Sequence, residues 1–140
     1  MDIQLSRVRV DLPGSGKPLF RIPRFVFPSG SHVLIEGASG RGKTTFLHLL
    51  AGLFLPEEGE VRVGGYHLNS LTDEQRAQFR RRHLGLVFQK LNLIDYLTVE
   101  ENVLLAMPRT TGNIRVVHDT LERLGLLKKR SEKSGNLSLG

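Results

Sequence analysis

The sequence predicts an α/β fold in which strands and helices follow one another around a glycine-rich turn. Residues 32–35 are a short apolar run typical of a buried strand, residues 37–44 are rich in glycine, and residues 45–51 carry a helical apolar stripe. Residues 3–10 alternate apolar and polar side chains, as a half-buried strand does. The 140 residues suffice for a small domain with a core, which would bury roughly 68% of the unfolded surface. Beyond residue 89, helix signals replace strand signals.

The glycine-rich stretch reads Gly37-Ala38-Ser39-Gly40-Arg41-Gly42-Lys43-Thr44, which fits the pattern Gly, four residues, then Gly-Lys-Ser/Thr. Glycines let backbone N–H groups approach phosphate oxygens, and the helix that follows points its positive end at the same anion. Lys43 would place its ammonium on the β- and γ-phosphates, and Thr44 would offer its hydroxyl to Mg²⁺. Thr45 is a candidate for a further phosphate contact. The stretch predicts a nucleoside triphosphate site, and the alternative is a glycine loop that binds nothing.

Two strands flank this stretch on its N-terminal side. The strand expected at residues 3–10 is followed by a Pro-Gly turn. A second strand is expected from Leu19 to Phe27, where Pro23 restricts it to a sheet edge or a bulge.

The segment after the first helix predicts a hairpin, a second helix and a buried strand. Residues 60–63 and 66–68 flank the two-glycine turn Gly64-Gly65. Thr72, with Gln three residues later, predicts a capping box that opens a helix to about Arg82. The apolar run 84–88 is typical of a buried parallel strand and ends at Gln89.

Helices are expected in the last third of the chain. Thr98 and Glu101 predict a second capping box, and the helix that it opens would stop at Pro108. A further helix would place Val117, Leu121 and Leu124 on one face, with Gly125 at its C-terminal cap. Residues 134–140 are expected to form a loop.

Composition narrows the function classes. The chain carries 20 Lys and Arg against 14 Asp and Glu, a net charge of +6, with basic clusters at 80–82 and 128–130. No aromatic residues interleave these clusters, so solvated helix ends are the favoured interpretation and no specific nucleic acid is expected. The absence of cysteine from the sequence excludes disulfides and thiolate metal sites. The most apolar run, 49–55, is too short to span a bilayer, and the N-terminus lacks a signal-peptide pattern, so a cytoplasmic protein is expected.

Four features of the chain together resemble an ABC-type ATPase subunit. They are the loop at 37–45, Gln89 after its apolar run, the Leu-Thr-Val-Glu-Glu-Asn-Val segment at 97–103 and the terminal Leu-Ser-Leu-Gly at 137–140. The resemblance implies a P-loop core with an antiparallel β subdomain and the start of a helical subdomain. It divides the chain into residues 1–89 and 90–140 and implies ATP and Mg²⁺ as cofactors. The residue pattern of 71–89 is similar to that of one branch of the family, which comprises the lipoprotein-releasing, macrolide-exporting and cell-division ATPases.

The family resemblance also implies roles and partners. Gln89 would contact Mg²⁺ and the attacking water. Ser138 and Gly140 match the signature Leu-Ser-Gly-Gly-Gln, with Leu139 in place of its first glycine, and would act in trans on the nucleotide of a second ATPase subunit in a head-to-tail dimer. The other implied partner is a membrane permease, contacted through residues 90–107 at the cytoplasmic face of the membrane.

Two departures from the family pattern bear on activity. Residues 10–13 include no aromatic side chain to stack the adenine, and no apolar run ending in Asp-Glu follows Gln89. The switch histidine is missing as well, and His118 is interpreted as a surface residue. We therefore expect an N-terminal fragment of the ATPase domain, cut inside the signature, that is inactive or nearly so.

Two other interpretations stay open from sequence. One is a soluble ABC protein that acts on the ribosome or on DNA, which the basic charge favours slightly. The other is an unrelated P-loop kinase in which residues 80–82 would imitate an arginine-rich lid, although Gln89 and residues 137–140 would then have no explanation.

Overall fold

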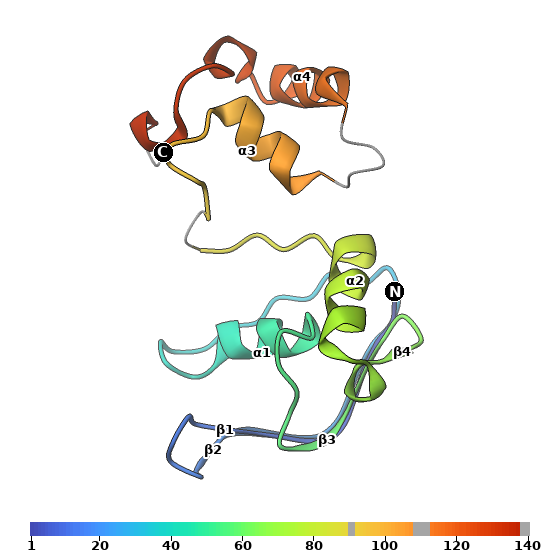
Figure 1. Ribbon diagram of the computed structural model, residues 1–140. Coiled ribbons are helices and arrows are strands. Elements are labelled where there is room, and N and C mark those ends of the chain that lie inside the picture. The colour runs from blue at the N-terminus through green and yellow to red at the C-terminus, as the bar shows by residue number, and fades with distance from the viewer. Residues whose placement is uncertain (90–91, 108–112, 138–140) are drawn as a thin grey trace. The chain divides into compact units, whose positions relative to one another are not determined.

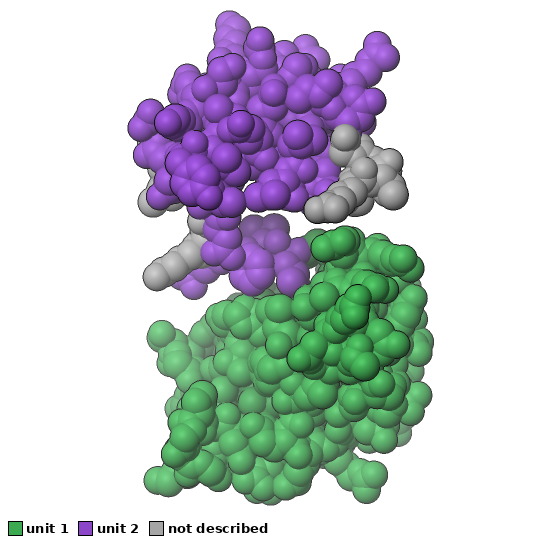
Figure 2. All heavy atoms as spheres, viewed as in Figure 1, with its two compact units in different colours: residues 1–85 green, residues 86–140 purple. Residues whose placement is uncertain are grey.

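The computed structural model describes residues 1–89, 92–107 and 113–137 (Figure 1). The chain forms two compact units, residues 1–85 and residues 86–140, which Figure 2 shows in different colours. Within the described ranges, no helix combines the length and the apolar character needed to cross a bilayer.

The first unit is an antiparallel sheet packed against helices. Its strands are β1 (Ile3–Asp11), β2 (Pro18–Phe27), β3 (Glu58–Val63) and β4 (Tyr66–His67), in the order β2-β1-β3-β4. Its helices are α1 (Lys43–Leu50) and α2 (Asp73–His83), with a single 3₁₀ turn, η1 (Leu68–Ser70), between β4 and α2. The strands expected at 3–10 and 19–27 and the hairpin around Gly64-Gly65 are confirmed, and β2 lies at the sheet edge where Pro23 is tolerated.

A β-bulge at Arg7 lets the apolar residues of β1 share one face. Arg7 has a φ of 51°, and the pairing of β1 with β3 shifts between Ser6 and Arg9. Gly59 lies opposite with a φ of +89°, and a Cβ built there would sit 2.3 Å from the Arg7 carbonyl oxygen. Only glycine fits this close backbone approach. The core-facing residues are Ile3 and Leu5 before the bulge and Val8 and Val10 after it.

Helix α1 lies along the apolar face of the sheet (Figure 1). Leu49 is 1% exposed, and the Phe46 ring meets the Phe20 ring edge-on with centroids 6.0 Å apart. The buried core consists of Leu5, Val8, Val10, Phe27, Leu49, Val61, Val63, Leu68 and Phe79. This packing fixes the axis of α1 and therefore the position of the glycine-rich stretch that precedes it.

Helix α2 begins at the predicted capping box and supports the end of α1. The Thr72 side chain accepts from the Gln75 backbone N–H, and the Gln75 side chain accepts from the Thr72 N–H. Arg80 Nη1 donates to the Gly52 carbonyl oxygen at 2.7 Å, just beyond the last turn of α1. Arg76 Nη1 likewise donates to the Leu71 carbonyl oxygen at 2.6 Å. The basic cluster at 80–82 is thus partly structural, because Arg80 satisfies a backbone acceptor instead of only facing solvent.

The expectation of strands at 32–35 and 84–88 is wrong for this structure. Neither segment pairs with a strand among the described residues, and Leu34 and Val87 are 80% and 95% exposed. Runs that are apolar on both faces suit a parallel strand with a neighbour on each side. The antiparallel sheet described here gives them no such neighbour.

The second unit contains α3 (Val99–Ala106) and α4 (Ile114–Arg123), with the 3₁₀ turns η2 (Leu127–Lys129) and η3 (Ser134–Asn136). Its capping box is confirmed, since the Thr98 side chain accepts from the Glu101 N–H and the Glu101 side chain from the Thr98 N–H. Pro108, the expected stop of α3, lies outside the described residues.

Helix α4 confirms two of its three expected core positions. Val117 and Leu121 are buried with Val99, whereas Leu124 is 65% exposed. Leu124 is the C-terminal cap, where the chain leaves the helix, so the helical period no longer applies to it. Gly125 follows the helix, as expected. The Gly125 N–H donates to the Glu122 carbonyl oxygen and the Leu126 N–H donates to the Leu121 carbonyl oxygen, which is the hydrogen-bond pattern of a Schellman motif.

Candidate phosphate-binding site

The glycine-rich stretch forms an exposed loop that turns sharply into α1. Gly37, Gly40 and Gly42 have φ angles of 153°, 77° and 85°, and the Arg41 N–H donates to the Ala38 carbonyl oxygen at 3.4 Å. Gly42 passes close to β2, because a Cβ there would come within 3.0 Å of the Leu19 side chain and 3.2 Å of the Phe20 ring. The loop is therefore held against the sheet at its C-terminal end and open to solvent at residues 37–41.

The N-terminus of α1 presents unsatisfied backbone donors. Its N-cap is Gly42, which supplies no side-chain acceptor, and its first turn holds no acidic residue. The N–H groups of a first helical turn have no intrahelical partner, so here Lys43, Thr44 and Thr45 offer theirs to an external acceptor. The helix dipole adds partial positive charge at the same place, which favours an anion.

Lys43 folds back over the loop. Its Nζ donates to the carbonyl oxygens of Gly37 at 2.6 Å and Ala38 at 2.8 Å, both in solvent-exposed positions. Carbonyl oxygens are neutral, so these bonds hold the ammonium in place without cancelling its charge. Because the contacts are exposed, a phosphate can replace one or both of them. Among the described residues, no buried ion pair holds Lys43.

The side chains around the loop fit a phosphate group better than they fit a metal alone. Thr44 is exposed and Thr45 half-buried, while Ser39 and Arg41 face solvent. Among the residues that the structure describes, no group of three or more His, Asp or Glu is placed to hold a metal ion. A Mg²⁺ ion would therefore arrive with the nucleotide, held by phosphate oxygens and the Thr44 hydroxyl.

The other predicted site residues belong to the second unit or lie outside the described residues. Gln89 is exposed and belongs to the second unit, so its contact with Mg²⁺ stays a prediction. Ser138 and Gly140 lie outside the described residues. The division at residue 89 also stays a proposal, four residues beyond the boundary at Gly85 between the two units.

A charged network, and no aromatic ring, occupies the end of β1. The Arg9 guanidinium donates twice to Asp11, at 2.8 and 2.7 Å, and once to Glu58 at 2.8 Å. These hydrogen bonds, to Asp11 first and then to Glu58, raise the pKa of Arg9 above its ordinary value. The Asp11 N–H also donates to Glu57. Asp11 is thus tied into this network, and the structure supplies no stacking platform at residues 10–13.

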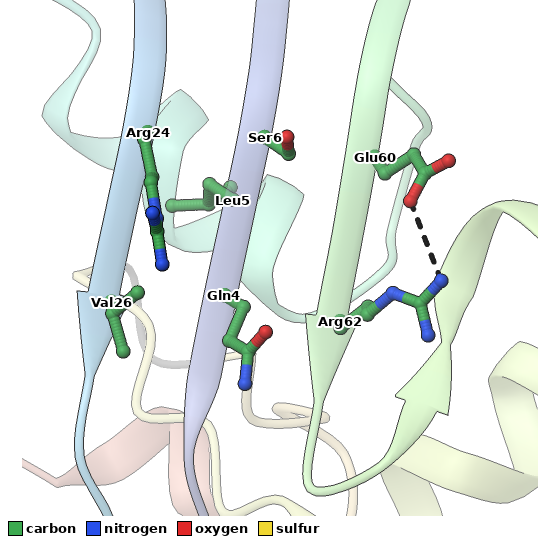
Figure 3. A pocket seen from close by; sticks show the side chains of 7 residues that line it. All are labelled: Gln4, Leu5, Ser6, Arg24, Val26, Glu60 and Arg62. Atoms are coloured by element: carbon green, nitrogen blue, oxygen red, sulfur yellow. Dashed lines mark hydrogen bonds and ion pairs between the residues drawn. The ribbon is translucent and has the colours of Figure 1, made fainter.

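The polar face of the sheet carries a hollow of about 330 Å³ that includes none of the loop residues. Figure 3 shows it crossing β2, β1 and β3, with Arg24 on one side and the Glu60–Arg62 ion pair on the other. A carboxylate and two guanidinium groups face the same open surface, and the carboxylate of Glu60 pairs with Arg62 at 3.5 Å.

A second hollow, of about 310 Å³, lies within the second unit and is more apolar. It is lined by Leu86, Val87, Phe88, Asn92, Leu93, Asn102, Leu105 and Ala106. The sequence predicted Leu86, Val87 and Phe88 as part of a buried strand, and their position in this hollow differs from that prediction. Exposed apolar side chains in a concave surface are typical of a protein-binding site.

The model of the ABC transporter family matches residues 21–140. The chain therefore belongs to the ABC transporter family, and the predicted family is confirmed. It is 40% identical over 116 residues to the lipoprotein-releasing system ATP-binding protein LolD of Xanthomonas oryzae, covering 80% of this chain and 48% of the relative. It is also 44% identical over 95 residues to the uncharacterized ABC transporter ATP-binding protein YvcR of Bacillus subtilis, covering 68% and 37%.

A third relative is the bacitracin export ATP-binding protein BceA of Halalkalibacterium halodurans, 44% identical over 81 residues. The chain spans between 37% and 48% of the length of the first two relatives. Among solved structures, the ATP-binding cassette MJ0796 in a dimeric post-hydrolysis state with ADP and Pi matches with a TM-score of 0.83 and 28% identity. That match covers 97% of this chain and 63% of the other, which confirms the fold class.

Proposed function

We propose that this chain binds MgATP through the loop at residues 37–45 and acts as part of an ATP-binding subunit coupled to a membrane permease. The observation that carries the proposal is the uncapped N-terminus of α1 beside the Lys43 ammonium, whose charge its two carbonyl partners do not neutralise. Together they make one positive, donor-rich surface, which favours an anion. The family match and the structural likeness to an ADP-bound cassette support the choice of nucleotide.

Each residue has a stated role in the proposal. The N–H groups at 40–45 and the Lys43 ammonium would hold the phosphates, and the Thr44 hydroxyl would coordinate Mg²⁺. The metal ion neutralises phosphate charge when it is bound. Gln89 would complete the Mg²⁺ site and sense the γ-phosphate.

We further propose that the 140 residues do not turn ATP over by themselves. Phosphoryl transfer depends on positioning and on charge stabilisation, and the loop supplies only part of both. Loss of the carboxylates that support Mg²⁺ and orient water would lower the rate by orders of magnitude. Phosphate release as fast as that of a full-length ABC ATPase would contradict this part of the proposal.

The permease would contact the apolar hollow of the second unit, which overlaps the predicted segment 90–107. Glu100 and Glu101 are unsuitable probes of that contact, because Glu100 lies 2.6 Å from His118 and Glu101 caps α3. Leu105 is a cleaner probe, since it is 64% exposed and lines the hollow. We expect Leu105→Glu to abolish permease binding, whereas Leu124→Glu, equally exposed and outside the hollow, should leave it intact. Equal binding by both variants would refute the assignment.

The second proposed partner is another ATPase subunit, and the proposed location is the cytoplasmic face of a membrane. The solved neighbours include a dimeric bacterial ABC transporter cassette. The names of two relatives describe lipoprotein release and bacitracin export. In the proposed dimer, Ser138 and Gly140 would reach the nucleotide bound by the other subunit.

Calorimetric titration with MgATP tests the nucleotide assignment. Lys43→Met removes one charge and should weaken binding by about 10- to 100-fold, as expected for loss of a hydrogen bond from a charged group. Lys129→Met is the matched control, because it makes the same change at an exposed position in the second unit. Unchanged affinity in Lys43→Met would overturn the proposal.

A further inference from the structure

Two segments of the second unit are joined by a seam of backbone hydrogen bonds. One segment, residues 94–100, runs into and opens α3, and the other, residues 130–135, leads toward the C-terminal residues. In each bond a backbone N–H donates to a backbone carbonyl oxygen: Val99 to Glu132 (3.0 Å), Glu100 to Arg130 (3.0 Å), Ser134 to Leu97 (2.9 Å) and Gly135 to Asp95 (3.1 Å). Thr98 and Lys133 form an isolated antiparallel bridge between them.

The side chain of Asn102 closes this seam from the helix side. Its Oδ1 accepts from the Ile94 N–H at 2.8 Å. Its Nδ2 faces the carbonyl oxygens of Ile94, Thr98 and Leu97 at 3.1, 3.1 and 3.4 Å. The same Nδ2 donates to Ser134 Oγ at 2.8 Å, and Ser134 is 6% exposed. One amide group therefore contacts the first segment, the start of α3 and the second segment.

The chemistry of this position requires an amide. Three carbonyl oxygens surround Nδ2, so an aspartate oxygen in its place would face three acceptors and lose the donor. Leucine has a similar shape but would leave the Ile94 N–H and the Ser134 hydroxyl without this partner. Asn102 belongs to the segment 97–103 that resembles the family, and the sequence alone does not explain why an asparagine stands there. The hydrogen bonds of its side chain explain it.

The two joined segments lead to different predicted parts of the ATPase machinery. Residues 94–98 lie shortly after Gln89 in the chain, and residues 130–136 precede Ser138 and Gly140. We propose that Asn102 is a positioning residue that makes these two segments move as one body, so that a nucleotide-dependent change in residues 94–98 is carried to residues 130–136. The inference rests on the proposed function, since it needs a nucleotide that Gln89 senses.

Hydrogen exchange of the whole chain, measured with and without MgATP alongside the MgATP affinity, tests the inference. Asn102→Leu removes the amide, and Ser134→Ala is a milder variant that removes only its bond to the second segment. Asn113→Ala is the matched control, because Asn113 caps α4 through its bond to the Arg115 N–H and does not touch the seam. Loss of a helix cap destabilises the helix, so the control weakens the same unit by another route.

Without nucleotide, we expect Asn102→Leu to speed exchange at Ser134 and Gly135 by about tenfold relative to Val117 and Leu121, as the loss of a buried hydrogen bond implies. With MgATP, exchange in the wild-type chain should change in both segments together. Asn102→Leu should keep its MgATP affinity and confine the change to residues 94–98, with Ser134→Ala intermediate. Asn113→Ala should respond like the wild type, which a merely stabilising role for Asn102 would not predict.

The results that would overturn the inference alone differ from those that would overturn the proposed function as well. If both segments respond in Asn102→Leu and Ser134→Ala as they do in the wild type, the inference is overturned while the proposed function stands. The same holds if MgATP binds to the wild type and residues 130–136 do not respond. If MgATP does not bind to the wild-type chain, the proposed function fails, and the inference fails with it.

Discussion

Replacing Gly59 with alanine tests whether the bulge in β1 organises the first unit. The new Cβ would lie 2.3 Å from the Arg7 carbonyl oxygen and 2.5 Å from that of Ser6, both of which are backbone atoms that cannot rotate away. Forcing the strands apart costs about 2 kcal/mol, in the range of overpacked cores. An alanine at a φ of +89° adds about 1 kcal/mol of backbone strain. We expect Gly59→Ala to lower the free energy of unfolding by about 3 kcal/mol.

Gly65→Ala is the matched control for that substitution. Gly65 has a φ of +83° and nothing within 4 Å of an added Cβ, so it carries the backbone strain alone. In urea unfolding with a slope of about 1.5 kcal/mol/M, the midpoint should fall by about 2 M for Gly59→Ala and by about 0.7 M for Gly65→Ala. Equal midpoints for the two variants would refute the role given to the bulge, because only the close approach to Arg7 distinguishes them.

Three further predictions concern stability and association. Arg80→Ala should lower the free energy of unfolding by about 1 to 2 kcal/mol, because the substitution leaves a carbonyl at the end of α1 without its charged donor. The control Arg81→Ala should change the free energy of unfolding by less than about 0.5 kcal/mol. Thr98→Ala should cost about 1 kcal/mol and reduce helical circular dichroism, since it removes the cap of α3; an unchanged melting curve would contradict the capping box. The exposed apolar runs at 32–35 and 84–88 should make the isolated chain self-associate, and light scattering that shows a stable monomer at high concentration would count against this.

Local signals in the sequence predicted the elements that depend on local chemistry. The capping boxes at Thr72 and Thr98 and the C-terminal glycine at Gly125 each act within a few residues, and the structure contains all three. The loop before α1 was predictable for the same reason, because its glycines and Lys43 form one continuous motif.

Features that depend on distant neighbours could not be predicted in the same way. The runs at 32–35 and 84–88 have the composition of buried strands, but a strand exists only where another strand pairs with it. Asn102 contacts Ser134 across 32 residues of sequence, and the two residue types do not predict that contact. The bulge at Arg7 interrupts the alternation expected over residues 3–10, and its cause, Gly59, lies on another strand.

In the proposed function, main-chain N–H groups and one ammonium hold a triphosphate at the start of α1. Backbone amide chemical shifts recorded by nuclear magnetic resonance during a MgATP titration test it residue by residue. We predict that the largest shifts fall on Gly40 to Thr45 and that Lys43→Met needs about 10- to 100-fold more MgATP to reach them. Shifts centred on the polar sheet face around Arg24 and Arg62, or no shifts at millimolar MgATP, would contradict it.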